Sequence, residues 1–211
     1  MDSQPNLMFV ARPGSDREQT AAMTKWRWRK ELLSERRRVP ASVRFEEAIS
    51  LSGHLTSGRV VRPGQTVCAF VPIASEPGSV QMLDDLHDFG ARVLLPVVIG
   101  RGALEWGWYA GKDSLVPGPY GLREPNGELL GVTALRIADM VLVPALAVDR
   151  NGIRLGRGAG HYDQSLPLAS NGTELVAVVR DQEIFEALPS EPHDVRMSAV
   201  LTPNRGLLRF V

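Results

Sequence analysis

Apolar residues at helical spacing predict a first helix at residues 24–38. In TKWRWRKELLSERRR, residues 24–38, the side chains of Trp28, Leu32 and Leu33 fall on one face, and arginine and lysine surround the rest. Thr24 is suited to cap the first turn. We therefore predict a strongly basic helix with one narrow buried face.

A second helix is predicted directly after Pro40. The stretch ASVRFEEAISLSGHL has helical periodicity and ends near Gly58. Its expected buried stripe comprises Val43, Ala48, Ile49 and Leu51.

Two short apolar runs predict buried strands joined by a helix. The first, TVCAFV at 66–71, is too brief for a buried helix and is bounded by Pro63-Gly64 and Pro72. Residues 79–90 then show helical spacing that ends at Gly90, and ARVLLPVV at 91–98 is a second strand. This order is typical of a right-handed crossover between parallel strands.

The rest of the chain continues the alternation of strands with loops and helices. We predict strands at 103–109, from Ala138 through 146, at 173–179 and at 198–202, and a short helix at 183–188. The proline- and glycine-rich residues 115–128 are expected to form a long loop, and such loops are often functional. The predicted fold is α/β, with a mainly parallel, Rossmann-like central sheet flanked by helices.

Composition adds limits on size and partners. The chain has 211 residues, of which 44% are hydrophobic and 23% charged, and this is enough for one compact domain at 23–211 after a flexible tail at 1–22. Lysine plus arginine and aspartate plus glutamate number 24 each, so no overall charge favours nucleic acid or a membrane surface. The sequence also lacks about 20 consecutive apolar residues for a membrane helix.

The single cysteine and the first residues favour the cytoplasm. Cys68 lies within an apolar run, where a thiol packs as a small hydrophobe, and one cysteine cannot form an internal disulfide. The short apolar patch LMFV near the start is briefer than the core of a secretory signal. We expect a cytoplasmic protein without nucleic-acid or membrane partners, and a monomer.

The segment RLGRGAGHYDQSL at 154–166 has the strongest chemical pattern. Its three glycines form a turn between a buried strand and an expected helix, so that backbone N–H groups can face an anion. Arg154 and Arg157 add forked donors that suit phosphate oxygens. The spacing matches neither Walker A nor a full dinucleotide fingerprint. A polyphosphate is the expected ligand, and a tight turn with solvated arginines is the alternative.

Two neighbouring features allow two readings each. Asp163 could bind Mg²⁺ beside a phosphate, or it could favour the start of a helix through the dipole. Lys25 and Arg29 share one helix face, which is either solvated or folded against the glycine-rich turn. His161 stays without an assigned role.

The chain resembles the 5-formyltetrahydrofolate cyclo-ligase family, also called methenyltetrahydrofolate synthetases. The likeness extends over nearly the whole chain from Lys25 onward. It rests on a Lys-xxx-Arg helix, an apolar strand leading to Pro72 and Glu76, the GLREP loop at 121–125, the block VPALAVDRNGIRLGRGAGHYD at 143–163 and a late Pro-His-Asp. The central block is the most specific part.

The resemblance implies a function, a cofactor and site residues. Family members use ATP and Mg²⁺ to convert 5-formyltetrahydrofolate into the 5,10-methenyl form, on an architecture shared with sugar-phosphate isomerases and coenzyme A transferases. Arg157 would face the transferring phosphoryl group. The resemblance also implies ATP contacts by Lys25, Arg29, Arg154, Leu155, Gly156, Arg157, Gly158, Ala159, Gly160, His161 and Tyr162, folate contacts by Val71, Glu76 and Tyr120, and magnesium ligation by Asp163 and Asp194.

Three positions depart from the common family pattern, namely Ala159, His161 and Ser198. Two alternatives to this function stay open. One is a non-catalytic relative that binds nucleotide or folate, and the other is a sugar-phosphate isomerase on the same architecture, because fold alone does not determine function.

Overall fold

The computed structural model describes residues 25–191 and 194–210. The tail predicted at 1–22 and the predicted cap Thr24 lie outside these residues. Within them, no helix is long and apolar enough to cross a membrane.

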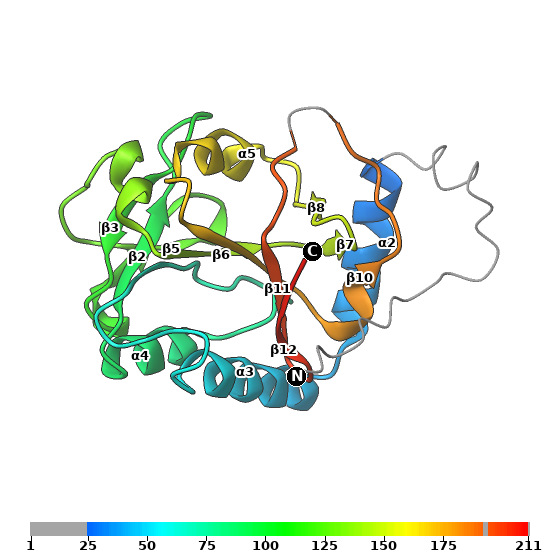
Figure 1. Ribbon diagram of the computed structural model, residues 1–211, viewed down its shortest axis with the longest axis horizontal. Helices are drawn as coiled ribbons and strands as arrows, with labels where there is room; N and C mark the ends of the chain where they lie inside the picture. The colour runs from blue at the N-terminus through cyan, green and yellow to red at the C-terminus, as the bar shows by residue number, and fades with distance from the viewer. Residues whose placement is uncertain (1–24, 192–193, 211) are drawn as a thin grey trace.

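A seven-stranded sheet in the order β12-β11-β9-β6-β1-β2-β3 forms the centre of the molecule (Figure 1). Strands β2, β1, β6, β9 and β11 run parallel, and an antiparallel strand closes each edge. The predicted mainly parallel α/β fold is therefore confirmed. The strands are β1 (Thr66–Cys68), β2 (Arg92–Val97), β3 (Glu105–Trp108), β6 (Met140–Pro144), β9 (Glu174–Val178), β11 (Ala199–Thr202) and β12 (Gly206–Arg209).

Helices α3 (Ala41–Leu55) and α4 (Val80–Asp88) cover one face of this sheet, and α5 (His161–Ser165) lies on the other (Figure 1). Alternate strand residues supply the two faces. In β6, Leu142 packs in the core beneath α3 and α4, while Val141 and Val143 pack in the opposite core. Because the central strands are buried on both faces, their sequences are near-continuous apolar runs.

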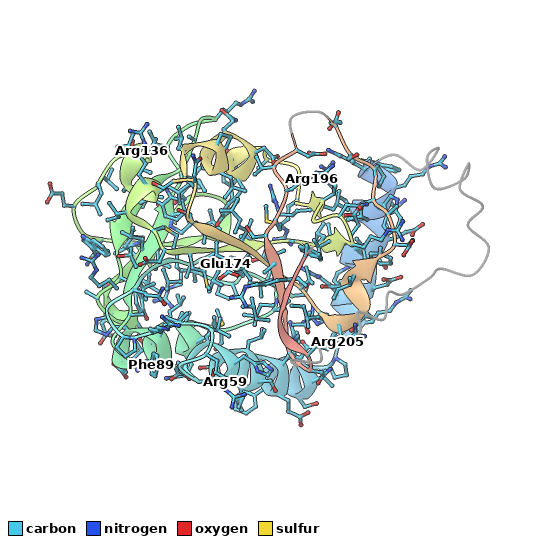
Figure 2. All side chains as sticks on the ribbon, viewed as in Figure 1. Arg59, Phe89, Arg136, Glu174, Arg196 and Arg205 are labelled. Atoms are coloured by element: carbon cyan, nitrogen blue, oxygen red, sulfur yellow. The ribbon has the colours of Figure 1, made fainter. Side chains whose placement is uncertain are left out.

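The surface of the molecule on the α3 and α4 side carries polar side chains together with some apolar ones. In Figure 2, Arg59 and Phe89 mark this side, beyond the ends of the two helices. The predicted stripe of α3 is half right: Ala48 and Leu51 are buried, but Val43 and Ile49 are exposed. The helix instead buries Ala48, Leu51, Ser52 and Leu55, a regular i, i+3, i+4, i+7 set.

Helix α2 (Lys25–Arg38) packs on a second, three-stranded sheet rather than on the central one (Figure 1). Trp28 and Leu32 of this helix are buried there, and the Trp28 ring meets the Phe185 ring edge to face at 4.9 Å. The sheet has the order β10-β7-β8 and consists of β10 (Ile184–Phe185), β7 (Ala147–Asp149) and β8 (Arg154–Leu155).

One expectation is wrong and two are incomplete. Residues 183–188 do not form a helix, because Ile184 and Phe185 are buried as β10 and pair with β7, after a 3₁₀ turn at Asp181–Glu183. The strand predicted at 198–202 is followed by a further strand, β12, through a turn at 203–205. The expected loop at 115–128 contains a hairpin of β4 (Leu115–Pro117) and β5 (Arg123–Pro125).

Candidate active site

The main cavity opens where the parallel strands end. Phe70 and Val71 follow β1, and Pro144 ends the neighbouring strand β6; all three line a cavity of about 710 Å³. The chain leaves β1 toward β2 on one side and later returns to β6 on the other, so β1 and β6 flank the switch point of the sheet. Ligands of open α/β sheets bind at this place.

All of the predicted site residues line this one cavity. They come from α2, from the loop after β1, from the hairpin β4–β5, from the segment between β8 and α5, and from the late segment around Asp194. The set is Lys25, Arg29, Val71, Glu76, Tyr120, Arg154, Leu155, Gly156, Arg157, Gly158, Ala159, Gly160, His161, Tyr162, Asp163 and Asp194.

The glycine-rich turn folds against the basic helix. Arg29 donates from Nε to the carbonyl oxygen of Gly156 at 2.9 Å. A β-carbon at Gly158 would lie 3.3 Å from the Arg29 guanidinium, and the residue has a φ of +101° that favours glycine. The basic face of α2 is therefore part of the cavity wall and not merely a solvated surface.

Helix α5 after the turn is only five residues long, so the expected helix-dipole contribution to anion binding is small. The positive charge comes from side chains instead.

His161 is the first residue of α5. Its Nδ1 donates to the carbonyl oxygen of Gly102 at 2.9 Å, which joins α5 to the loop after β2.

Arg154 is nearly buried and pairs with Asp163. Its Nη2 donates to Asp163 Oδ1, and its guanidinium lies 5.7 Å from the centre of the Tyr162 ring. Burial lowers the pKa of Arg154, and the Asp163 carboxylate opposes that shift. Burial also raises the pKa of Tyr162, whose buried hydroxyl has no hydrogen-bond partner among the described residues. Tyr162 therefore stays neutral, and it lines the cavity.

Lys25 is held by two carboxylates. Its ammonium nitrogen lies 2.8 Å from both oxygens of Asp194 and 2.7 Å from Glu191 Oε2. Burial alone would lower the pKa of Lys25, but its hydrogen bonds to Asp194 and Glu191 outweigh burial and raise it. The ammonium stays charged, beside an acidic residue that the resemblance assigns to magnesium.

Glu76 lies in the loop after β1 and lines the same cavity. Its side chain is only 7% exposed and is 3.4 Å from Arg157 Nη1, and its Oε2 accepts the Ile73 N–H at 3.0 Å. Burial raises the pKa of Glu76, although the Ile73 N–H and the charges of Arg157 and Arg36 lower it in part. Arg157 is 36% exposed, so it can move toward a ligand at little cost in packing.

The hairpin β4–β5 forms the far wall. Tyr120 at its tip is 85% exposed and has a φ of +58°, an unusual conformation for a residue other than glycine. Buried Glu124 fastens the hairpin by accepting the Val98 N–H at 2.9 Å.

Sequence reasoning missed part of the lining. Within the quoted GLREP loop, Leu122 and Arg123 reach the cavity, and their place beside Tyr120 was a usable signal. The remaining residues carried no signal of their own because they are distributed over the ends of several strands and the loops beside them. They are Phe70, Ile73, Pro96, Val98, Gly100, Arg101, Leu104 and Pro144.

Comparison with known proteins establishes the family. The model of the 5-formyltetrahydrofolate cyclo-ligase family matches residues 21–203. The chain belongs to the 5-formyltetrahydrofolate cyclo-ligase family. The cyclo-ligase of Mycolicibacterium smegmatis is 49% identical over 190 residues, which cover 88% of this chain and 96% of that protein. The cyclo-ligase of Escherichia coli K12 is 32% identical over 143 residues, 66% of this chain and 79% of that protein.

Solved structures share the fold of this cyclo-ligase family member. The 5,10-methenyltetrahydrofolate synthetase of Aquifex aeolicus superimposes with a TM-score of 0.77 at 25% identity, covering 89% of this chain and 93% of that one. The synthetase of Mycoplasma pneumoniae gives a TM-score of 0.67 at 18% identity over 84% of this chain and 98% of that one, a likeness of fold.

Proposed function

We propose that this chain is an ATP-dependent 5-formyltetrahydrofolate cyclo-ligase that produces 5,10-methenyltetrahydrofolate, ADP and phosphate. The carrying observation is one cavity of about 710 Å³ in which a cationic, glycine-lined wall faces a buried carboxylate, in a chain of the cyclo-ligase family. Its volume lies within the range of about 300–1,000 Å³ that is typical of ligand sites.

The cationic wall is the proposed triphosphate site. Lys25, Arg29, Arg154 and Arg157 all line it, and the small residues 156, 158, 159 and 160 let a ligand approach the backbone. Forked guanidinium donors suit phosphate oxygens. Ala159 supplies no charge, so the positive charge of this wall comes from the four side chains just named.

The opposite wall is the proposed folate site. Phe70 and Val71 offer apolar surface, and Tyr120 offers an exposed aromatic ring. The Glu76 carboxylate is the buried acceptor on this side, suited to N–H groups of a flat heterocycle. The Glu76 carboxylate lies 3.4 Å from Arg157, so the proposed folate and phosphate sites adjoin each other.

The proposed chemistry has two steps. The formyl oxygen attacks the γ-phosphorus, so that an O–P bond forms and the bond to ADP breaks. The N10 lone pair then attacks the activated formyl carbon, the C–O bond breaks with its electrons going to phosphate, and the N10 proton passes to water. Arg157 would neutralise charge on the transferring group, and positioning supplies most of the remaining rate.

Mg²⁺ would be held mainly by the nucleotide. Among the described residues, no group of three or more histidine, cysteine or acidic side chains forms a metal cage. A nucleotide-bound Mg²⁺ needs only one or two protein carboxylates. Asp163 fits, since only its Oδ1 is engaged by Arg154. Both oxygens of Asp194 are engaged by Lys25, so Asp194 would bind the ion only if Lys25 released one of them. When bound, the ion supplies charge neutralisation of the phosphates.

The test is the ATP- and Mg²⁺-dependent appearance of the methenyl chromophore from 5-formyltetrahydrofolate, with stoichiometric phosphate release. Omission of ATP and chelation of Mg²⁺ are the controls, and both should abolish the signal. Folded protein that binds both substrates but releases no phosphate would favour the non-catalytic relative. Turnover of a sugar phosphate without ATP would favour the isomerase.

A further inference from the structure

A buried network of two arginines and two glutamates lies behind the cavity. Arg36 and Arg180 have side chains that are 2% and 1% exposed. Arg36 binds both oxygens of Glu183 at 2.7 Å, and its Nη2 also donates to the carbonyl of Ala145 at 2.6 Å. Glu183 in turn accepts the backbone N–H of Arg180 at 2.7 Å. Removing these charged groups from water costs free energy, so we expect the network to have a function.

Arg180 connects three parts of the fold. It lies two residues after the end of β9, and its Nε lies 2.9 and 2.8 Å from the two oxygens of Glu47 on α3. Its Nη1 donates to the carbonyl oxygen of Ser75 at 3.0 Å. That carbonyl belongs to the peptide unit that joins Ser75 to Glu76. The guanidinium fork therefore fixes the backbone from which the Glu76 side chain extends.

The loop that carries Glu76 needs such support. Ala74 has a φ of +52°, in the left-handed region that residues other than glycine rarely occupy. The loop is closed by the Glu76 N–H donating to Ile73 at 3.0 Å and by the Glu76 carboxylate accepting the Ile73 N–H. Arg44 adds a longer hydrogen bond of 3.3 Å to the Ala74 carbonyl. Arg180 is thus the buried tie between this strained turn and the sheet.

We propose that Arg180 is a positioning residue for Glu76: by holding the Ser75–Glu76 peptide it sets where the buried carboxylate meets the folate substrate. This inference rests on the proposed function for the identity of that substrate. Arg180 does not line the cavity, so it acts on the ligand only through the loop.

Lysine is the informative substitution. Arg180→Lys keeps the positive charge beside Glu47 and Glu183, but one ammonium cannot replace the fork that reaches Glu47 and Ser75 together. Arg36→Lys is the matched control, because Arg36 is equally buried, pairs with the same Glu183 and makes no hydrogen bond to the loop 72–77. Both variants should lose comparable thermal stability.

The experiment compares KM values for both substrates and adds a cycle with Glu76→Gln. Arg180→Lys should raise KM for the folate by about tenfold and leave KM for Mg-ATP within about twofold, because misplacing one charged acceptor removes roughly one hydrogen bond to substrate. In the Glu76→Gln background, Arg180→Lys should add less than about twofold, since coupled residues are not additive.

Three outcomes would overturn the inference. The first is that Arg36→Lys raises the folate KM as much as Arg180→Lys does. The second is that the KM effects of Arg180→Lys and Glu76→Gln multiply in the double variant. The third is that Arg180→Lys lowers the melting temperature without changing the folate KM. Equilibrium titration with 5-formyltetrahydrofolate gives the same comparison without turnover. A wild-type protein that binds this folate but makes no product would defeat the proposed function, while the binding cycle would still test Arg180.

Discussion

The two walls of the cavity hold their charges in different ways. On the phosphate wall, Lys25 and Arg154 each pair with a carboxylate that also lines the cavity, so an incoming anion or cation can exchange partners with them. On the folate wall, Glu76 contacts Arg157 of the glycine-rich turn, but the backbone that carries Glu76 is tied by the buried Arg180, which does not line the cavity. The first wall can adapt to a flexible polyphosphate, whereas the second is preorganised for a rigid ring system.

The largest expected effect comes from removing Glu183, which binds both Arg36 on α2 and Arg180 behind Glu76. Glu183→Ala leaves Arg36 and Arg180 without their common partner, so the free energy of unfolding should fall by about 3–5 kcal/mol. Urea unfolding followed by tryptophan fluorescence measures it. The control Glu186→Ala removes an exposed pair with Arg150 and should cost about 1 kcal/mol or less. A loss as small as the control would show that the network contributes little.

The phosphate wall is tested next by Arg157→Ala. We expect kcat to fall by about 100- to 1,000-fold with little change in melting temperature, because a half-exposed arginine contributes little packing but neutralises transition-state charge. Arg150→Ala, at an exposed arginine that also has one ion pair, should leave kcat within about twofold of wild type. Parallel losses of activity and melting temperature in Arg157→Ala would argue for a structural role.

The folate wall is tested by Glu76→Gln in otherwise wild-type protein. KM for the folate should rise by about tenfold, because a charged hydrogen-bond acceptor is lost. The dissociation constant for Mg-ATP, measured by calorimetry, should change by less than about twofold. A collapse of nucleotide affinity would place Glu76 on the phosphate wall and remove the contrast between the two.

The smallest effect concerns stability and pH. Because burial raises the pKa of Glu76 above its ordinary value of 4.5, ionisation disfavours the folded state, and this penalty grows as pH rises from 4.5 through the folded pKa. Below 4.5 the carboxyl group is protonated in both states. The melting temperature of Glu76→Gln relative to wild type should therefore increase between pH 4.5 and 7. Glu128→Gln, at an exposed glutamate, controls for the substitution itself, and identical profiles of the two variants would contradict the prediction.

Local patterns predicted the elements whose residues bury one regular face. The β1, α4 and β2 unit follows directly from its apolar runs and glycine stops, and the structure confirms the parallel pairing of β1 with β2. The pattern failed at Ile184 and Phe185, where two residues were read as helical because pairing with β7, 36 residues earlier at Val148, decides their conformation. A cytoplasmic location, a monomeric state and the roles of single site residues stay predictions.

The amino-acid sequence by itself determined the chemistry of this protein: the glycine-rich turn, its arginines and the acidic residues are encoded in contiguous, recognisable segments. Only the tertiary structure decided which of these residues face one another. The contact between Arg180 and Ser75 joins positions 105 residues apart, and that between Lys25 and Asp194 joins positions 169 apart. Such contacts depend on how the strands are ordered in the sheet, and no local periodicity records that order.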